Sequence, residues 1–415
     1  MAFKTISVIG LGYIGLPTAA VFASRKVNVI GVDVNQKAVD TINKGEIHIV
    51  EPDLDMVVHA AVTEGYLKAT ITPEPADAFL IAVPTPFKGD NHEPDLSYIE
   101  SASKAIAPVL KKGDLVILES TSPVGATEQV AEWLAAARPD LTFPQTAGEE
   151  SDIRVAHCPE RVLPGKVLEE LVSNDRVIGG MTSKCTEQAS ALYKIFVKGE
   201  CVATNARTAE MAKLTENSFR DVNIAFANEL SIICDKLDIN VWELISLANR
   251  HPRVNILQPG PGVGGHCIAV DPWFIVSKTP GEARLIRAAR EVNDGKPEWV
   301  IEKYKELLST LLLANPSLAA KDVIVSCYGL AFKADIDDVR ESAALKIAKA
   351  VKVIHPGEVY AVEPNIQGDV SGLRNLDLQS AIEKAHLHIL LVEHAQFKGE
   401  CPDSKYLIDT KGLWC

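Results

Sequence analysis

The sequence lacks any apolar run that approaches the ~20 residues needed to cross a membrane as a helix, so no membrane span is expected. It also lacks a Cys-x-x-Cys pair among its eight cysteines, which opposes a structural zinc site and a disulfide framework. A β-branched run that predicts a strand begins by residue 5, which opposes a secretory leader. No internal repeat or low-complexity stretch is present. The absences predict a protein of the reducing cytoplasm.

Basic residues are scarce as well. Lys and Arg total 42 against 55 Asp and Glu, which gives a net charge of -13 at pH 7. Such an acidic chain repels nucleic acid, and a phosphorylated ligand would have to be held by locally concentrated basic side chains and by amides at helix N-termini. A chain of 415 residues is too long for one ordinary core and indicates two or three domains.

A dinucleotide-binding pattern stands near the start of the sequence. A β-branched run at 5–10 is followed by the turn Gly10-Leu-Gly-Tyr-Ile-Gly15, a helical segment at 16–24 and a second apolar run at 27–33. This βαβ context makes the Gly-x-Gly-x-x-Gly match specific. The second run ends in Asp33, which is placed to accept hydrogen bonds from the adenosine ribose, and no Arg follows it directly. NAD is therefore the expected cofactor rather than NADP.

Each position of the turn has its own expected role. Gly10 permits a tight turn, Gly12 lets the backbone approach the pyrophosphate, and Gly15 allows the helix to pack closely on the strand. The amides of Tyr13 and Ile14 are placed to meet phosphate oxygens. The alternative is a glycine-rich turn that binds nothing, which the complete βαβ unit disfavours.

The rest of the sequence predicts two α/β domains around a helical segment. Short apolar runs predict further strands at 78–83, 115–118 and 155–158. The stretch 204–237 contains neither Gly nor Pro and predicts a long helix, and helices are expected to continue to about Leu313. Strand character returns at 322–327, 358–362 and 386–392. We expect two doubly wound, Rossmann-like α/β domains, at 1–203 and 316–415, joined by an all-helical segment at 204–315.

Polar loops follow two of the predicted strands, at the edge where open α/β sheets bind ligands. One is Val83-Pro-Thr-Pro86 and the other begins at Glu119-Ser-Thr-Ser-Pro-Val-Gly125. Thr85, Thr121 and Thr127 are candidates for polar contacts at this edge. Ordinary turn residues would look the same.

Charged and amide side chains suited to dehydrogenation follow. Glu160 and Arg161, after the strand predicted at 155–158, could act as general base and anion ligand or form a solvated pair. In the long helix, Lys213, Asn217 and Arg220 fall at i, i+4 and i+7 and so lie on one face. Lysine can take a hydroxyl proton or stabilise an oxyanion while asparagine orients the substrate oxygen. The alternative is a solvent-facing polar stripe.

Cys267 lies in a glycine-rich segment, and four glycines precede it within eight residues, which is typical of a tight loop beside a ligand. An enzyme that oxidises an alcohol to a ketone needs no thiol. One that continues to a carboxylate can hold the aldehyde as a thiohemiacetal, from which a second hydride leaves. The thiol therefore indicates a four-electron oxidation. Any single cysteine is more often a small buried hydrophobe, and the other seven are interpreted in that way.

Further candidates surround Cys267. Asp271 could position the lysine or a hydrolytic water, and His266 could lower the thiol pKa or recognise substrate. His251 and Arg253 belong to a short basic cluster that could grip a diphosphate. These spacings are not those of a zinc site, so no metal is expected.

The last domain offers two basic residues. Lys333 follows a predicted strand and is placed to meet a second nucleotide. Arg340 lies in the segment 338–342, which is expected to open a helix, and could reach across a domain cleft to the cofactor.

Taken together, these motifs resemble the UDP-glucose/GDP-mannose dehydrogenase family, in order and over nearly the whole chain. The matching positions are Gly10–Gly15, Asp33, Glu119–Thr121, Pro159–Arg161, Lys213 with Asn217, Gly264–Cys267 with Asp271, Phe332–Lys333 and Arg340–Ser342. His266 and the stretches 251–262, 47–53 and 81–89 look like the N-acetylhexosamine branch of the family rather than the glucose branch. The resemblance implies an NAD-binding domain, a long central helix that mediates dimerisation, and a C-terminal domain that binds UDP.

The resemblance also implies roles for the matching residues. Catalysis would use Cys267 as nucleophile and Lys213 as acid and base, with Asn217 and Asp271 assisting and Thr121 and Glu160 serving thioester hydrolysis. The substrate, a nucleotide sugar, would be held by Arg161, Val162, Lys213, Asn217, Arg220, Gly264 and Lys333, with His251 and Arg253 entering the site of the other subunit of a homodimer. NAD would contact Gly10, Gly12, Tyr13, Ile14, Gly15, Asp33, Thr85, Thr127 and Arg340.

Two other interpretations stay open. A β-hydroxyacid dehydrogenase of the 6-phosphogluconate type shares the glycine fingerprint and a helical Lys-x-x-x-Asn pair, but it needs no cysteine and makes one NADH per substrate. A protein that only binds NAD would leave Lys213 and Cys267 incidental. The sugar itself is not fixed, because epimers differ at one carbon and discrimination rests on the shape of the pocket.

Overall fold

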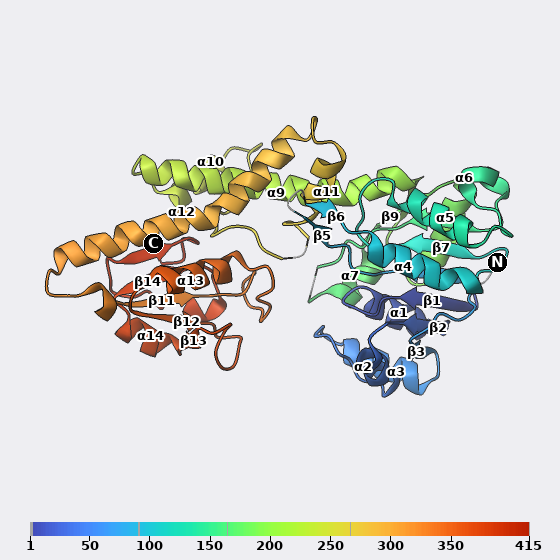
Figure 1. Ribbon diagram of the computed structural model, residues 1–415, viewed down its shortest axis with the longest axis horizontal. Coiled ribbons are helices and arrows are strands. Elements are labelled where there is room, and N and C mark those ends of the chain that lie inside the picture. Colours follow the sequence, from blue (N-terminus) through green and yellow to red (C-terminus); the bar gives the residue numbers. More distant parts are fainter. Residues whose placement is uncertain (1–2, 90–91, 164, 266, 415) are drawn as a thin grey trace. The chain divides into compact units, whose positions relative to one another are not determined.

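The computed structural model describes residues 3–89, 92–163, 165–265 and 267–414. The chain divides into two compact units, residues 1–216 (unit 1) and residues 217–415 (unit 2), and each contains a sheet flanked by helices (Figure 1). None of the helices in the described ranges is both long enough and apolar enough to span a bilayer.

Unit 1 is built on an eight-stranded sheet with the strand order β10-β9-β8-β7-β4-β1-β2-β3. Its strands are β1 (Thr5–Ile9), β2 (Asn28–Val32), β3 (Leu67–Thr70), β4 (Ala78–Ile81), β7 (Leu115–Leu118), β8 (Arg154–His157), β9 (Arg176–Gly180) and β10 (Cys201–Asn205). The strands from β8 to β3 are parallel. In contrast, β9 runs antiparallel to β8 and pairs in parallel with β10. The carboxyl ends of the parallel strands therefore share one edge.

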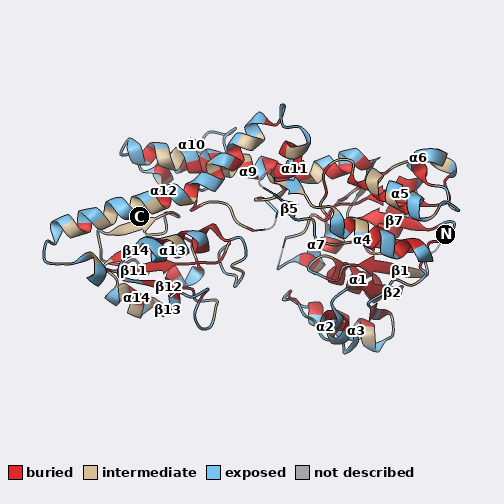
Figure 2. Cartoon of the chain, in the orientation of Figure 1, coloured by how far each residue is buried: buried red, intermediate tan, exposed pale blue. Residues whose placement is uncertain are grey.

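Helices cover both faces of this sheet and bury its strands (Figure 2). The strands carry apolar side chains on both faces, which form two separate core clusters. In β7, Ile117 belongs to the same cluster as Phe22 of α1. Its neighbour Val116 belongs to the cluster on the other face, with Val130 of α5. The helices are α1 (Gly15–Ser24), α2 (Gln36–Asn43), α3 (Leu54–Thr63), α4 (Ser97–Ile106), α5 (Ala126–Ala137), α6 (Pro144–Ala147), α7 (Val167–Ser173) and α8 (Ser183–Tyr193), and a short antiparallel pair joins β5 (Phe87–Lys88) to β6 (Glu93–Pro94).

Long helices follow the first sheet. The helix α9 (Ala206–Lys236) has 31 residues, runs through the boundary between the two units, and contains neither Gly nor Pro. It is followed by α10 (Val241–Ala248), α11 (Asp271–Lys278) and α12 (Arg284–Ala314). The side chain of Asn240 caps α10 by accepting hydrogen bonds from the amides of Trp242 and Glu243. The described residues between α10 and α11 form neither helix nor strand.

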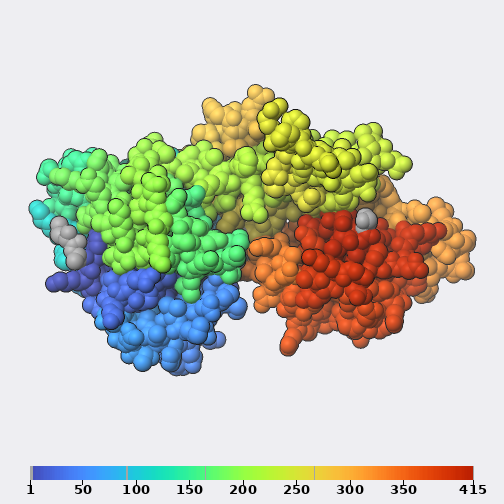
Figure 3. Space-filling view, turned by 180° about the vertical axis from the view of Figure 1, so that it is seen from behind, coloured from blue at the N-terminus to red at the C-terminus, as the bar shows by residue number. Residues whose placement is uncertain are grey.

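Unit 2 contains a second, all-parallel sheet with the order β13-β12-β11-β14-β15. Its elements are β11 (Ile324–Tyr328), α13 (Ala343–Ile354), β12 (Glu358–Val362), β13 (Arg374–Asn375), α14 (Leu378–Lys384), β14 (Leu387–Leu390) and β15 (Leu407–Asp409). Helices α12 and α13 cover one face, and α14 covers the other. The C-terminal segment, red in Figure 3, packs against α10, since a Cβ on Gly412 would lie 2.3 Å from the Trp242 ring.

The doubly wound α/β architecture and the helical segment agree with the sequence-based prediction, and each predicted strand and the long helix are found within a few residues. Three strands of the first sheet, β3, β9 and β10, were not predicted. The reason is clearest for β10, an edge strand whose residues are largely exposed and so carry no apolar run. The segment 338–342 does not open a helix: α13 begins at Ala343, and Ser342 caps it by accepting the amide of Leu345.

Candidate active site

The glycine turn between β1 and α1 has the geometry of a close backbone approach. Gly10 has a φ of +92°, and a Cβ there would lie 2.6 Å from the carbonyl oxygen of Ala82. A Cβ on Gly15 would lie 1.8 Å from the carbonyl oxygen of Gly10, so both positions require glycine. A Cβ on Gly12 would meet no atom within 4 Å, which leaves this position open toward a ligand.

The end of this turn forms the N-terminus of α1, where no side chain caps the backbone amides and an anion could bind. Ile14 is the N-cap of α1, its side chain makes no cap bond, and the first turn of the helix carries no acidic residue. Tyr13 is 44% exposed. The carboxylate of Asp33, at the end of β2, accepts the amides of Leu11 at 2.9 Å and Asn35 at 2.8 Å, which fixes its orientation beside the turn.

Two loops meet at the carboxyl ends of β4 and β7, which are adjacent strands. Ser120 donates a hydrogen bond of 2.7 Å to the carbonyl oxygen of Val83 and so joins the loop of Thr121 to the loop of Thr85. The Thr85 hydroxyl is buried and has no hydrogen-bond partner. An orphaned hydroxyl at this edge is what a ligand contact would satisfy. Thr121 is partly exposed beside it.

Thr127 has a partner inside the protein. It is fully buried in the first turn of α5, and its hydroxyl and amide both donate to Glu210 of α9, at 2.6 and 2.7 Å. The second carboxylate oxygen of Glu210 accepts the amide of Gly125. Glu210 therefore caps α5, where its charge is favoured by the helix dipole. The cofactor contact expected of the Thr127 side chain stays a prediction.

Glu160 forms an ion pair in the interior of unit 1. Its carboxylate lies 2.7 Å from the guanidinium of Arg176 and accepts the amide of Arg161 at 2.6 Å. Only 6% of Glu160 is exposed. The Arg161 side chain pairs with Glu216 on α9 at 2.6 Å, and Val162 is partly buried against the core. Glu160 is thus an oriented carboxylate rather than one half of a solvated pair.

A second carboxyl group, that of Glu119, lies at the end of β7 and is 1% exposed. It accepts a hydrogen bond of 2.6 Å from the hydroxyl of Tyr193, and its other oxygen has no partner. Burial raises its pKa to about 7, with Arg176 opposing and Glu160 adding to the shift. Glu119 stood in a recognised motif, but no sequence signal pointed to Tyr193 of α8, which donates to it, or to Arg176 of β9, whose charge opposes the rise of its pKa.

In unit 2 the structure brings together residues that are far apart in the sequence. The side-chain amide of Asn217, on α9, donates a hydrogen bond of 2.5 Å to the carboxylate of Asp271, 54 residues further along. Asp271 is 3% exposed and is the first residue of α11. Lys213 lies one helical turn before Asn217 on α9 and is partly exposed. The Lys-x-x-x-Asn pair is therefore not simply a solvated stripe.

Cys267 precedes α11 in a tight turn. Its carbonyl oxygen accepts the amides of Val270 at 3.0 Å and Asp271 at 2.8 Å, and the residue is exposed. A Cβ on Gly264 would lie 2.5 Å from the carbonyl oxygen of Glu341, so the glycine loop packs closely against the segment before α13. His266 lies outside the described residues.

The other cysteines differ in burial, although all were expected to be buried. Cys158 and Cys327 are fully buried, and burial raises the pKa of each thiol to about 12. The expectation of burial is wrong for Cys401, which is exposed, because the irregular segment before β15 provides no core to cover it. Cys201 is partly exposed.

The remaining basic candidates lie at the surface. Arg220, His251, Arg253 and Lys333 are all exposed. Lys333 follows the carboxyl end of β11, and Arg340 forms an ion pair of 2.6 Å with Asp338 in the loop before α13. The described residues contain no group of three or more His, Cys, Asp and Glu side chains that could hold a metal ion.

Comparison with known families matches three parts of the chain. Residues 4–197 match the NAD binding domain of the UDP-glucose/GDP-mannose dehydrogenase family, residues 207–295 its central domain, and residues 326–414 its UDP binding domain. The chain belongs to this family. It is accordingly an NAD-dependent UDP-sugar dehydrogenase.

Relatives align over the full length of the chain. The UDP-N-acetyl-D-mannosamine dehydrogenase of Yersinia pestis is 66% identical over 100% of both chains. The NDP-N-acetyl-D-galactosaminuronic acid dehydrogenase of Ralstonia nicotianae is 64% identical over 99% of this chain and 96% of its own. Among solved structures, a UDP-D-ManNAc dehydrogenase from Pyrococcus horikoshii has a TM-score of 0.87 and 39% identity, with 99% of this chain and 96% of that chain covered.

The first sheet of this dehydrogenase fits NAD. The open position at Gly12, the uncapped first turn of α1 and the oriented carboxylate of Asp33 match a pyrophosphate next to a ribose. When bound, NAD supplies the hydride acceptor. The second sheet repeats part of this geometry, because the amide of Leu330 donates to Glu363 at the end of β12 as Leu11 does to Asp33. Glu363 differs in that it is buried and bonded to His394.

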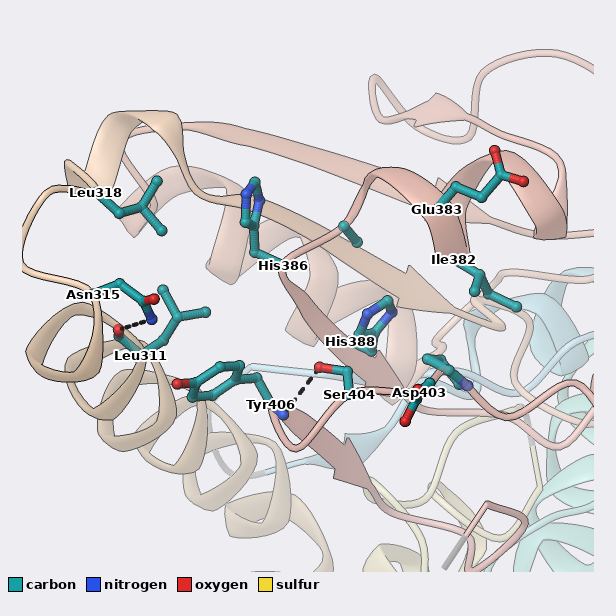
Figure 4. A pocket seen from close by; sticks show the side chains of 12 residues that line it. Leu311, Asn315, Leu318, Ile382, Glu383, His386, His388, Asp403, Ser404 and Tyr406 are labelled. Atoms are coloured by element: carbon teal, nitrogen blue, oxygen red, sulfur yellow. Dashed lines mark hydrogen bonds between the residues drawn. The ribbon is translucent and has the colours of Figure 1, made fainter.

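A separate hollow of about 380 Å³ lies in unit 2 (Figure 4). His386, His388 and Tyr406 are among the residues that line it. They stand at the amino ends of β14 and β15, whereas Lys333 follows the carboxyl end of β11. The hollow and the predicted substrate residue are thus at opposite edges of the sheet.

Proposed function

We propose that this protein oxidises UDP-N-acetyl-D-mannosamine at C6 to UDP-N-acetyl-D-mannosaminuronate, with two NAD reduced per sugar. The observation that carries the chemistry is the linked set of Asn217, Asp271 and Cys267: the side-chain amide of Asn217 donates to the buried carboxylate of Asp271, and the backbone amide of Asp271 donates to the carbonyl oxygen of Cys267, the residue that bears the thiol. The choice of sugar is supported by the 66% identical relative from Yersinia pestis and by the likeness of residues 251–262 to the N-acetylhexosamine branch.

The first oxidation removes the C6 hydroxyl proton and a hydride. Lys213 accepts the proton, and Asn217 orients the substrate oxygen, because both side chains lie on one face of α9. Asp271 holds the amide of Asn217 in position by accepting its hydrogen bond. The product of this step is an aldehyde at C6.

The second oxidation uses the thiol. The sulfur of Cys267 adds to the aldehyde carbon and forms a thiohemiacetal. Loss of a second hydride from that carbon, with loss of the hydroxyl proton, gives a thioester. Water then attacks the thioester, the carbon–sulfur bond breaks, and the carboxylate and the thiol are released. Thr121 and Glu160 order this water, and the ion pair with Arg176 keeps Glu160 oriented.

We propose the following residues for binding the nucleotide sugar and NAD. Arg161, Val162, Arg220, Gly264 and Lys333 hold the nucleotide sugar together with Lys213 and Asn217. Thr85, Thr127 and Arg340 join the glycine turn and Asp33 in contacting NAD. The corresponding domain boundaries are 1–203 for NAD, 204–315 for the helical segment and 316–415 for UDP.

We also propose a homodimer formed through α9. Phe219, Phe226 and Ile233 recur at intervals of seven residues along this helix and are 72%, 53% and 44% exposed. An apolar stripe at this spacing is suited to pair with a second helix. In such a dimer His251 and Arg253 enter the other subunit's site.

The sugar is tested by assay with UDP-N-acetyl-D-mannosamine, its gluco epimer, the galacto diastereomer and UDP-glucose. The galacto compound is included because the 64% identical relative from Ralstonia nicotianae is named for an N-acetyl-D-galactosaminuronic acid. We expect the highest kcat/KM with the manno compound and two NADH per sugar. Preference for another of these nucleotide sugars refutes the choice of sugar, and one NADH per substrate supports the two-electron alternative.

The mechanism is tested with Cys267→Ser. We expect this variant to complete the first oxidation and to stall at the aldehyde, which hydroxylamine traps as an oxime. Cys401→Ser is the matched control, since Cys401 is also an exposed cysteine of unit 2 but lies outside the proposed site. Undiminished formation of two NADH per sugar by Cys267→Ser contradicts the mechanism.

A further inference from the structure

Four polar side chains are buried between α9 and α12 in unit 2. Asp221 and Asn228 lie seven residues apart on α9, and Arg290 and Asn293 lie three apart on α12, so each pair occupies one face of its helix. All four are at most 1% exposed. We refer to them as the polar seam.

The seam is a continuous chain of hydrogen bonds. Arg290 pairs with Asp221 at 2.6 Å, Asn293 donates to the same carboxylate oxygen at 2.8 Å, and Asn228 donates to the side-chain oxygen of Asn293 at 2.8 Å. One oxygen of Asp221 and the Nε of Arg290 have no partner. Packed apolar side chains of similar volume are often at least as stabilising as a buried ion pair, so stability alone does not account for the seam.

Both ends of the seam contact the loop that carries Cys267. The amide of Gly260 donates to the side-chain oxygen of Asn228 at 2.8 Å. Beyond the cysteine, the carbonyl oxygen of Ile268 accepts from the guanidinium of Arg290 at 3.5 Å. The loop needs such contacts, because its described residues belong to no helix or strand. Outside the seam, Lys411 donates to the carbonyl oxygen of Pro259 at 3.4 Å.

We propose that Asn228 and Arg290 are positioning residues that hold the Cys267 loop in the geometry required for attack on the aldehyde. The proposal rests on the proposed role of Cys267 as nucleophile. Neither residue is proposed to touch the reacting atoms. They act on the backbone before and after the thiol, and the seam couples the two contacts through α9 and α12.

A loop held in this way matters most to the second oxidation. The first hydride transfer uses Lys213 and Asn217, whose backbones belong to α9, and Asp271, which holds the Asn217 amide, belongs to α11. The thiol is needed only when the aldehyde has formed. Misplacement of a reacting group by about 1 Å can slow a step by about a hundredfold. A loosened loop should therefore slow the formation of the second NADH much more than that of the first.

The test compares Asn228→Ala with Ser231→Ala in the full-length protein. Asn228→Ala removes the bond to Gly260. Ser231→Ala removes a bond from Lys296 and a bond to the backbone carbonyl oxygen of Asn228 within α9, neither of which reaches the loop. A second variant, Arg290→Lys, keeps a positive charge beside Asp221 but loses the guanidinium group, which also donates to the carbonyl oxygen of Ile268. It guards against a failure to fold, because removing the charge would leave Asp221 buried and unpaired.

Two measurements decide the proposal. In single-turnover assays with UDP-N-acetyl-D-mannosamine, Asn228→Ala should form the first NADH within about twofold of the wild-type rate and the second about ten- to a hundredfold more slowly. Hydrogen exchange without substrate should become faster for amides in 259–270 and stay unchanged in α10. Ser231→Ala should change neither.

Equal slowing of both steps, unchanged exchange of the loop, or the same effects in Ser231→Ala would overturn the proposal. Failure of the proposed function has a different signature, since the wild-type protein would then form fewer than two NADH per sugar. In that case the exchange measurement still decides whether Asn228 and Arg290 hold the loop.

Discussion

Replacement of Glu119 by Gln should make the stability of unit 1 less dependent on pH. Glu119 is 1% exposed, and burial raises its pKa from the ordinary 4.5 to about 7. Between these values the folded protein keeps a proton that the unfolded chain has lost. The free energy of unfolding therefore falls as pH rises through this window, and the loss is nearly complete by about pH 8.

The magnitude follows from the width of the window. The 2.5 pH units between 4.5 and about 7 correspond to about 3 kcal/mol, at about 1.4 kcal/mol per unit. Glutamine has nearly the same shape, is neutral at every pH, and its carbonyl oxygen can still accept the bond from Tyr193. Part of this window lies below pH 5, so relative to the wild type Glu119→Gln should gain about 2.5 kcal/mol between about pH 5 and about pH 8.

The assay is urea unfolding at these two pH values, with hydrogen exchange of peptides from β7 and β8 to report on unit 1 separately. Two compact units need not unfold together, so the exchange measurement assigns the change. Glu46→Gln is the control, because Glu46 is an exposed glutamate of the same unit. A difference between Glu119→Gln and wild type that is equal at both pH values would refute the reasoning.

Two further predictions concern the cofactor turn and the dimer. Gly15→Ala should destabilise unit 1, because the new Cβ would lie 1.8 Å from the carbonyl oxygen of Gly10. Gly12→Ala should instead keep the wild-type melting temperature and weaken NAD binding by about tenfold, as measured by calorimetry. Equal NAD affinity in Gly12→Ala and wild type would contradict the proposed cofactor contact. Phe226→Asp should convert the protein to a 44.9 kDa monomer in light scattering, since it places a charge in the exposed stripe of α9, and an unchanged mass would argue against that interface.

The local chemistry of the site could be predicted where consecutive residues carry it. The turn from Gly10 to Gly15 was recognisable because its roles depend on backbone geometry within one βαβ unit. The long helix was recognisable from the absence of Gly and Pro. The start of α13 was placed too early, because polar residues before a helix resemble its first turn until the cap at Ser342 is known.

The partners of the predicted residues could not be found in this way. The sequence allows Glu160 to be either a base or half of a solvated pair, and only the structure pairs it with Arg176. The Thr127 side chain looked available for a cofactor, but its hydroxyl donates a hydrogen bond to Glu210 of α9, which stands 83 residues later in the sequence. Neither partner stands in a motif, and pairing across such distances leaves no local pattern.

The sequence by itself determined the family, the cofactor and the order of the domains, because each of these depends on motifs that lie within short stretches of the sequence. Only the tertiary structure decided how Asn217 meets Asp271, how Glu119 comes to hold a proton near neutral pH, and how Asn228 reaches the loop before Cys267. The physical reason is that burial and hydrogen bonding between distant segments set the energy of a polar group, and these are properties of the packed chain rather than of any stretch of it.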